Sequence, residues 1–208
     1  MTLQRFQTDQ LTATPWKNGG GVTREIACYP ANAGLDDFQW RLSLAHVASD
    51  GPFSAFPDVD RVITLLDGAG MHLRSTDGGI DHALEHLEPF AFPGDADVYC
   101  RLTGMECNDF NVMSRRGIMR AEVGLVCNAS TLNTSPHGAL LAVQGEWLAY
   151  VGPNLPDHTL TPGEGMWWAD ESIEWFMTPG SPDAALLAVH IWPAGAAAKP
   201  DDDAHPQP

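Results

Sequence analysis

Short hydrophobic runs separated by turn residues constrain this chain most, because they are too brief for long helices. Phe38, Trp40, Leu42 and Leu44 alternate with polar residues, which is the period of a strand with one buried face. No segment keeps a 3.6-residue apolar period for three or more turns. Further strands are expected at 61–66, 98–102, 119–126, 139–143, 147–151, 173–176 and 184–191, and a loop at 128–138. The chain is therefore predicted to be all-β, with few short helices.

A weak internal repeat divides the chain into two halves. In the first half Leu65-Leu66-Asp67-Gly68 precedes Pro93-Gly94-Asp95, and in the second the segment 140–145 precedes Pro162-Gly163-Glu164. This Pro-Gly-acid turn between hydrophobic strands resembles the turns that separate the strands of cupin barrels, which are closed jelly rolls. We therefore expect a bicupin of two fused jelly-roll-type β-barrels, the first over residues 1–120 and the second over 121–193, with strand sharing between them left open. Residues 194–208 hold almost no bulky side chains and are expected to form a disordered tail.

Composition limits the partners of the chain. Its 208 residues include 27 acidic and 11 basic residues, a formal net charge of −16 that disfavours nucleic acid and anionic membranes. The few cations lie near Gly-, aromatic- or Asn-containing segments, an arrangement that suits a small anionic ligand. The longest apolar run, 184–198, is interrupted by His190 and Pro193 and is too short for a membrane span. Without a cationic leader the protein is expected to be cytoplasmic, with its four cysteines as buried, reduced thiols.

Metal-binding patterns are incomplete. Where cupins carry an HxH pair and a later His, this chain has only His72, then Asp97, and Met166 in the second half. Residues 82–86 match the HxxEH pattern of some zinc peptidases, but they lie between glycines and a proline, too close for a well-supported helix. We interpret them as solvated residues beside a hairpin, and expect no metal and no cofactor.

Three segments carry candidate binding groups. The glycines of Lys17-Asn18-Gly19-Gly20-Gly21 allow close backbone approach to an anion, although a flexible turn explains them equally well. Asp109, Asn111 and Met113 share one strand face, as do Arg41 and Ser43. Guanidinium groups suit a dicarboxylate or an acylated amino acid. The alternatives are an Asp–Arg lock between strands and ordinary surface salt bridges.

Four motifs in order resemble the HutD/Ves family: 15–26 (PWKNGGGVTREI), 40–43 (WRLS), 51–61 (GPFSAFP to DR) and 109–113 (DFNVM). The resemblance implies a bicupin without the usual metal. It also implies a HutD-like role in governing histidine utilisation by sensing an intermediate such as formylglutamate, or a Ves-like role in stress response. Trp16 is the aromatic candidate for the ligand-binding wall, and the resemblance adds Lys17, Asn18, Gly19, Arg24, Arg41, Ser43, Ser54, Arg61, Asp109, Asn111 and Met113.

Three functional hypotheses follow. The first is a non-enzymatic regulator that binds a small anionic metabolite, since no nucleophile or general-base pair is evident. The second is a metal-independent cupin enzyme that works through Asp109 and His72. The third is a scaffold that pairs through an exposed barrel edge, either with a second copy as a homodimer or with another protein.

Overall fold

The fold is all-β, as predicted. The computed structural model describes residues 2–152 and 157–196. These residues form nineteen strands and one short 3₁₀ helix, η1 (Thr8–Gln10). No helix in these ranges is long and apolar enough to cross a membrane. Most of the tail predicted to be disordered, residues 197–208, lies outside the described residues.

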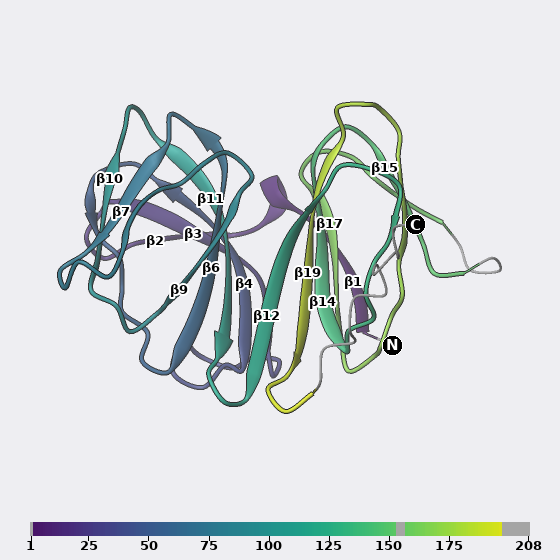
Figure 1. Ribbon diagram of the computed structural model, residues 1–208, viewed down its shortest axis with the longest axis horizontal. Helices are drawn as coiled ribbons and strands as arrows, with labels where there is room; N and C mark the ends of the chain where they lie inside the picture. The colour runs from purple at the N-terminus through teal and green to yellow at the C-terminus, as the bar shows by residue number, and fades with distance from the viewer. Residues whose placement is uncertain (1, 153–156, 197–208) are drawn as a thin grey trace, which may run out of the picture.

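The first half of the chain forms two sheets that face each other (Figure 1). The six-stranded sheet runs β2 (Ala13–Pro15), β3 (Gly21–Tyr29), β4 (Trp40–Val47), β11 (Cys107–Arg115), β6 (Val59–Gly68) and β9 (Pro89–Pro93). The four-stranded sheet opposite runs β5 (Gly51–Pro52), β10 (Val98–Leu102), β7 (Met71–Ser75) and β8 (Asp81–Ala83). All these neighbours pair antiparallel.

The second half repeats the arrangement of two facing sheets. The five-stranded sheet runs β1 (Thr2–Gln7), β17 (Glu164–Ala169), β14 (His137–Gln144), β19 (Ala185–Pro193) and β12 (Met119–Val126). The other sheet runs β13 (Ser130–Thr131), β18 (Phe176–Pro179), β15 (Trp147–Tyr150) and β16 (His158–Leu160). The first strand of the chain thus pairs with β17, far away in sequence.

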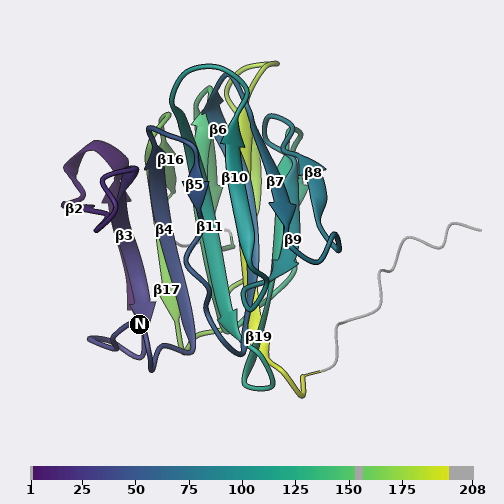
Figure 2. The same ribbon diagram turned by 90° about the vertical axis from the view of Figure 1, so that its left-hand side faces the viewer.

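A central apolar layer joins the halves, because β11 turns directly into β12, which lies in the other half's sheet (Figure 1). Trp40, Leu42, Phe110 and Val112 of the six-stranded sheet pack in one cluster with residues of β14 and β19. Strand β11 is buried on both faces for most of its length, since this layer covers one side and the first half's interior the other. Figure 2 shows β3, β4, β11 and β6 side by side, the strands that carry the polar residues described below.

Most predicted strands are present, and two coincide with β10 and β12. The strand expected at 173–176 is wrong. Ile173 and Trp175 are both buried in the core, which explains their alternation, but Ile173 makes only an isolated bridge and β18 begins at Phe176. The predicted loop at 128–138 contains the short β13, and its last two residues already belong to β14. Of the four cysteines expected to be buried, Cys28 is partly exposed and Cys127 is exposed.

Within the described ranges the four sheets remain separate in their hydrogen bonding, so each half is a pair of facing sheets and not one continuously bonded barrel.

Candidate functional site

A cavity of about 800 Å³ opens inside the first half, a volume typical of small-molecule sites. Its floor is one face of the six-stranded sheet, and its walls come from the turn between β2 and β3 and from the segment after β5. The residues around it are Thr14, Pro15, Trp16, Lys17, Asn18, Thr23, Glu25, Leu35, Arg41, Ser43, Ala45, Pro52, Phe53, Ser54, Phe56, Arg61, Asp109, Asn111 and Met113.

Strand register brings the polar floor together. Asp109, Asn111 and Met113 lie opposite Ala45, Ser43 and Arg41 of β4, in that order. On the other side of β11, Met113 lies opposite Arg61 of β6. Because side chains alternate along a strand, the residues between them point into the apolar layer against the second half. The six-stranded sheet therefore turns its apolar face toward the second half and its polar face toward the cavity.

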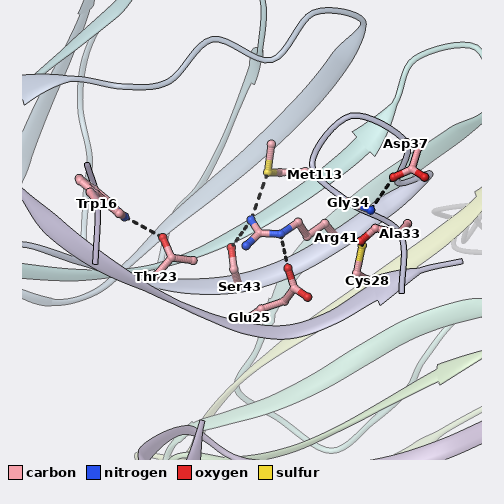
Figure 3. Close-up of polar contacts among 10 residues, drawn as sticks. All are labelled: Trp16, Thr23, Glu25, Cys28, Ala33, Gly34, Asp37, Arg41, Ser43 and Met113. Carbon is pink, nitrogen blue, oxygen red and sulfur yellow. Dashed lines mark hydrogen bonds and ion pairs between the residues drawn. The ribbon is translucent and has the colours of Figure 1, made fainter. Parts of the chain in front are cut away.

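Arg41 is held in place by an ion pair and two weaker contacts (Figure 3). Its Nε lies 2.6 Å from a carboxylate oxygen of Glu25, and its Nη1 lies 3.3 Å from the Ser43 hydroxyl and 4.0 Å from the Met113 sulfur. The Arg41 side chain is 11% exposed, whereas Glu25 is half exposed. Glu25 thus neutralises part of the positive charge of Arg41 at the cavity wall.

Arg61 is buried, and it forms no ion pair with any described residue. Its guanidinium carbon lies 5.3, 5.6 and 4.9 Å from the ring centroids of Phe53, Phe56 and Phe92. The Nη1 donates one long hydrogen bond of 3.4 Å to the Ser54 carbonyl, while the buried Nε has no partner. Desolvation lowers the pKa of Arg61 to about 10, partly opposed by the charge of Asp109. The side chain is still a cation at neutral pH, held among aromatic rings.

Asp109 and Asn111 supply the acceptors of the cavity. Asp109 is 1% exposed, and the Oδ1 atoms of both side chains are buried without a hydrogen-bond partner among the described residues. Desolvation raises the pKa of Asp109 to about 7, with the charge of Arg61 working in the opposite direction. Buried polar atoms nearly always have partners, so the unpaired donors and acceptors around this cavity make it the candidate binding site.

The glycine-rich turn places Trp16, Lys17 and Asn18 at the cavity. Gly19 has a φ of +73°, and its amide donates to the Trp16 carbonyl over 3.0 Å. The next amide donates to the Asn18 side chain, also over 3.0 Å. Both amides are therefore used inside the turn, and the turn serves the cavity through its side chains. A Cβ on Gly21 would lie 2.3 Å from a backbone oxygen of β4 and 3.1 Å from the Trp16 ring, so only glycine fits there.

All the predicted site residues line this cavity except Gly19 and Arg24. Arg24 lies between Thr23 and Glu25 on β3, and since those two face the cavity, strand alternation turns Arg24 to the opposite side. His72, the suggested enzymatic partner of Asp109, is not a lining residue and bonds to Asp81 at 2.6 Å. Asp109 and His72 therefore do not form a common site.

Several cavity residues were missed. Glu25, Phe53 and Phe56 all lie in the quoted motifs. The strand pattern places Glu25 on the same face as Thr23, but it does not by itself show that this face of β3 lines the cavity. Phe53 and Phe56 lie shortly before Arg61 in the same motif, whereas Phe92 on β9 is distant in sequence, and no local signal indicates that its ring packs on Arg61.

The HxxEH segment forms no helix. Residues 81–83 are the short strand β8, where His82 stacks on Phe90 at 3.8 Å, and His86 lies 2.9 Å from the Leu66 carbonyl. The two histidines thus have separate packing roles. In the part of the chain that the structure describes, no group of three or more His, Cys, Asp or Glu side chains is placed to hold a metal ion.

Comparison with known proteins gives close and remote relatives. The HutD family model matches residues 8–184. Protein Ves of Cronobacter sakazakii is 39% identical over 171 residues, which is 82% of this chain and 89% of that protein. The structure of HutD from Pseudomonas fluorescens SBW25 superimposes with a TM-score of 0.80 at 29% identity, over 93% of this chain and 100% of that chain.

A more remote likeness concerns the fold alone. A cupin 2 conserved barrel domain protein from Leptotrichia buccalis has a TM-score of 0.58 at 10% identity, over 90% of this chain and 96% of that chain. The architecture is therefore cupin-like. With the family model covering most of its length, this chain belongs to the HutD/Ves family.

Proposed function

We propose that this protein is a non-enzymatic regulator of histidine utilisation that binds a small carboxylate metabolite in the cavity of its first half. The observation that carries the proposal is Arg61, a buried cation without a protein counter-ion at the wall of a cavity of about 800 Å³. A buried charge without a partner is costly to the fold. An anionic ligand that pairs with the guanidinium would compensate this cost, because two parallel N–H groups match a carboxylate.

The remaining cavity groups suit an acylated amino acid. Arg41 and Lys17 add positive charge from two other elements. The unpaired oxygens of Asp109 and Asn111 accept hydrogen bonds, which the N–H of an amide can donate. A ligand with carboxylates and an amide N–H, such as N-formylglutamate, would therefore use both kinds of group.

The two halves of the molecule are, in this proposal, two cupin-type units, the first over residues 1–120 and the second over 121–193. Each has two facing sheets with a hydrophobic core between them. Strand β1 pairs with β17, so the first unit would contribute its first strand to the sheet of the second unit. Among the described residues, those that line the cavity all belong to the first unit.

Titration calorimetry with N-formyl-L-glutamate, urocanate and L-glutamate tests the binding proposal. We expect N-formyl-L-glutamate to bind more tightly than millimolar. Arg61→Met should weaken it at least about 30-fold, because loss of a buried charged contact costs about 2 kcal/mol or more. Arg74→Met is the matched control, since Arg74 is exposed on β7 and pairs with Asp81 away from the cavity. Absence of binding by all three compounds would refute the proposal.

The regulatory part requires a cellular measurement. In a host whose own gene has been replaced, Arg61→Met should change expression of the histidine-degrading enzymes during growth on histidine, whereas Arg74→Met should not. Equal expression with both variants would contradict a regulatory role for the cavity.

A further inference from the structure

Asp109 is a buried carboxyl group that is available to a ligand. It lies on β11 at the floor of the cavity, 1% exposed, and its Oδ1 has no hydrogen-bond partner among the described residues. The charge of Arg61 acts on it, but the two side chains form no ion pair. The protein therefore gives this carboxyl group neither an ion-pair partner nor a hydrogen-bond partner at Oδ1.

The ionisable groups around Asp109 come from every element packed against it. They are Arg61 on β6, Arg41 on β4, Glu25 on β3, Lys17 in the turn between β2 and β3, and the buried thiol of Cys100 on β10. Burial raises the pKa of Cys100 to about 12, so the thiol is neutral. The cavity cations outnumber the carboxylates by one when Asp109 is ionised and by two when it is protonated. A protonated Asp109 therefore makes the cavity better suited to a ligand with two negative charges.

No histidine lines the cavity within the described residues. Desolvation of the buried Asp109 side chain raises its pKa to about 7. An incoming carboxylate would add negative charge beside it and favour the protonated form further.

We propose that the protein binds its carboxylate ligand together with one proton, which Asp109 takes up from solvent and donates as an O–H hydrogen bond to a ligand oxygen. No covalent bond in the ligand forms or breaks. Asp109 thus acts as a specificity residue that makes ligand affinity depend on pH. The inference rests on the proposed function, because it concerns the same cavity and the same class of ligand.

Titration calorimetry of the full chain with N-formyl-L-glutamate at about pH 6, 7 and 8 tests this coupling. The carboxylates of the ligand remain ionised over this range. The dissociation constant is expected to rise roughly tenfold from pH 6 to pH 8, as proton linkage requires for a group that titrates near 7 in the free protein. At pH 8 close to one proton should be taken up from the buffer on binding. The binding enthalpies measured in phosphate and in Tris should therefore differ by nearly the full difference between the ionisation enthalpies of the two buffers.

Two variants assign the effect to Asp109. Asp109→Asn keeps the size and a hydrogen-bond donor but cannot titrate, so it should bind the ligand with an affinity that no longer depends on pH. Glu25→Gln removes the other cavity carboxylate, which is half exposed, and should keep the pH dependence. If Asp109→Asn fails to fold by circular dichroism, the two-buffer measurement on the unaltered chain decides.

The outcomes separate this inference from the proposed function. Binding with the same affinity at all three pH values, proton release on binding, or an unchanged pH dependence in Asp109→Asn would overturn the inference and leave the anion site standing. No binding at any pH would refute both.

Discussion

Replacing Arg61 by methionine should stabilise the protein while removing its ligand site. Burial lowers the pKa of Arg61 to about 10, which corresponds to roughly 3 kcal/mol against the charged guanidinium in the folded state. Because the folded-state pKa is depressed, this cost is fully present below about pH 10 and is lost only as the pH rises toward the value of the unfolded chain. Methionine keeps an apolar side chain of similar length among the aromatic rings and removes the charge.

Part of this gain is offset. The guanidinium lies within 5.6 Å of three phenylalanine ring centroids, and the lost cation–π contacts cost up to about 2 kcal/mol together. Asp109 also loses the attraction of Arg61, but near pH 6 it is mostly protonated, so this loss is small there. The net expectation for Arg61→Met at pH 6 is a gain of about 1 to 2 kcal/mol, or roughly 2 to 8 °C in Tm.

Urea denaturation at pH 6, followed by tryptophan fluorescence, measures this difference. Arg61→Lys serves as the control, since it retains a titratable cation and should gain less. If Arg61→Met proves less stable than the parent by more than about 1 kcal/mol, then Arg61 supports the fold, and the argument that its charge is kept for a ligand is wrong.

Three further changes test the neighbouring groups. Asp109→Asn should match the parent in stability near pH 4 and exceed it by about 4 kcal/mol near pH 8 in urea titrations, because a pKa raised from 3.8 to about 7 makes the stability of the parent decline as the pH rises over that range; an equal difference at both pH values would contradict this. Glu25→Gln should free Arg41 and tighten N-formyl-L-glutamate binding about threefold in calorimetry, with a change in stability below about 0.5 kcal/mol, and weaker binding would contradict it. Gly21→Ala should destabilise by about 2 kcal/mol in thermal unfolding, since its Cβ would meet a backbone oxygen at 2.3 Å, whereas Gly124→Ala in open space should not, and equal losses would refute the steric argument.

The strand content and the shared face of Asp109, Asn111 and Met113 could be predicted from local patterns, because side-chain alternation is a property of each strand by itself. The same rule places Arg41 and Ser43 together. It did not exclude Arg24, since deciding which face of β3 lines the cavity requires the pairing of β3 with β4, which includes an irregularity between Glu25 and Ala27.

Long-range pairing explains what sequence reasoning missed. The Glu25–Arg41 ion pair joins neighbouring strands, and the rings around Arg61 combine Phe53 and Phe56 from the segment after β5 with Phe92 from β9. The pairing of β1 with β17 likewise has no local signal. A strand's own residues specify which side chains share a face, but the burial and charge state of those side chains depend on what other segments cover them, so the unpaired cation and the near-neutral carboxyl pKa emerge only when the chain is folded.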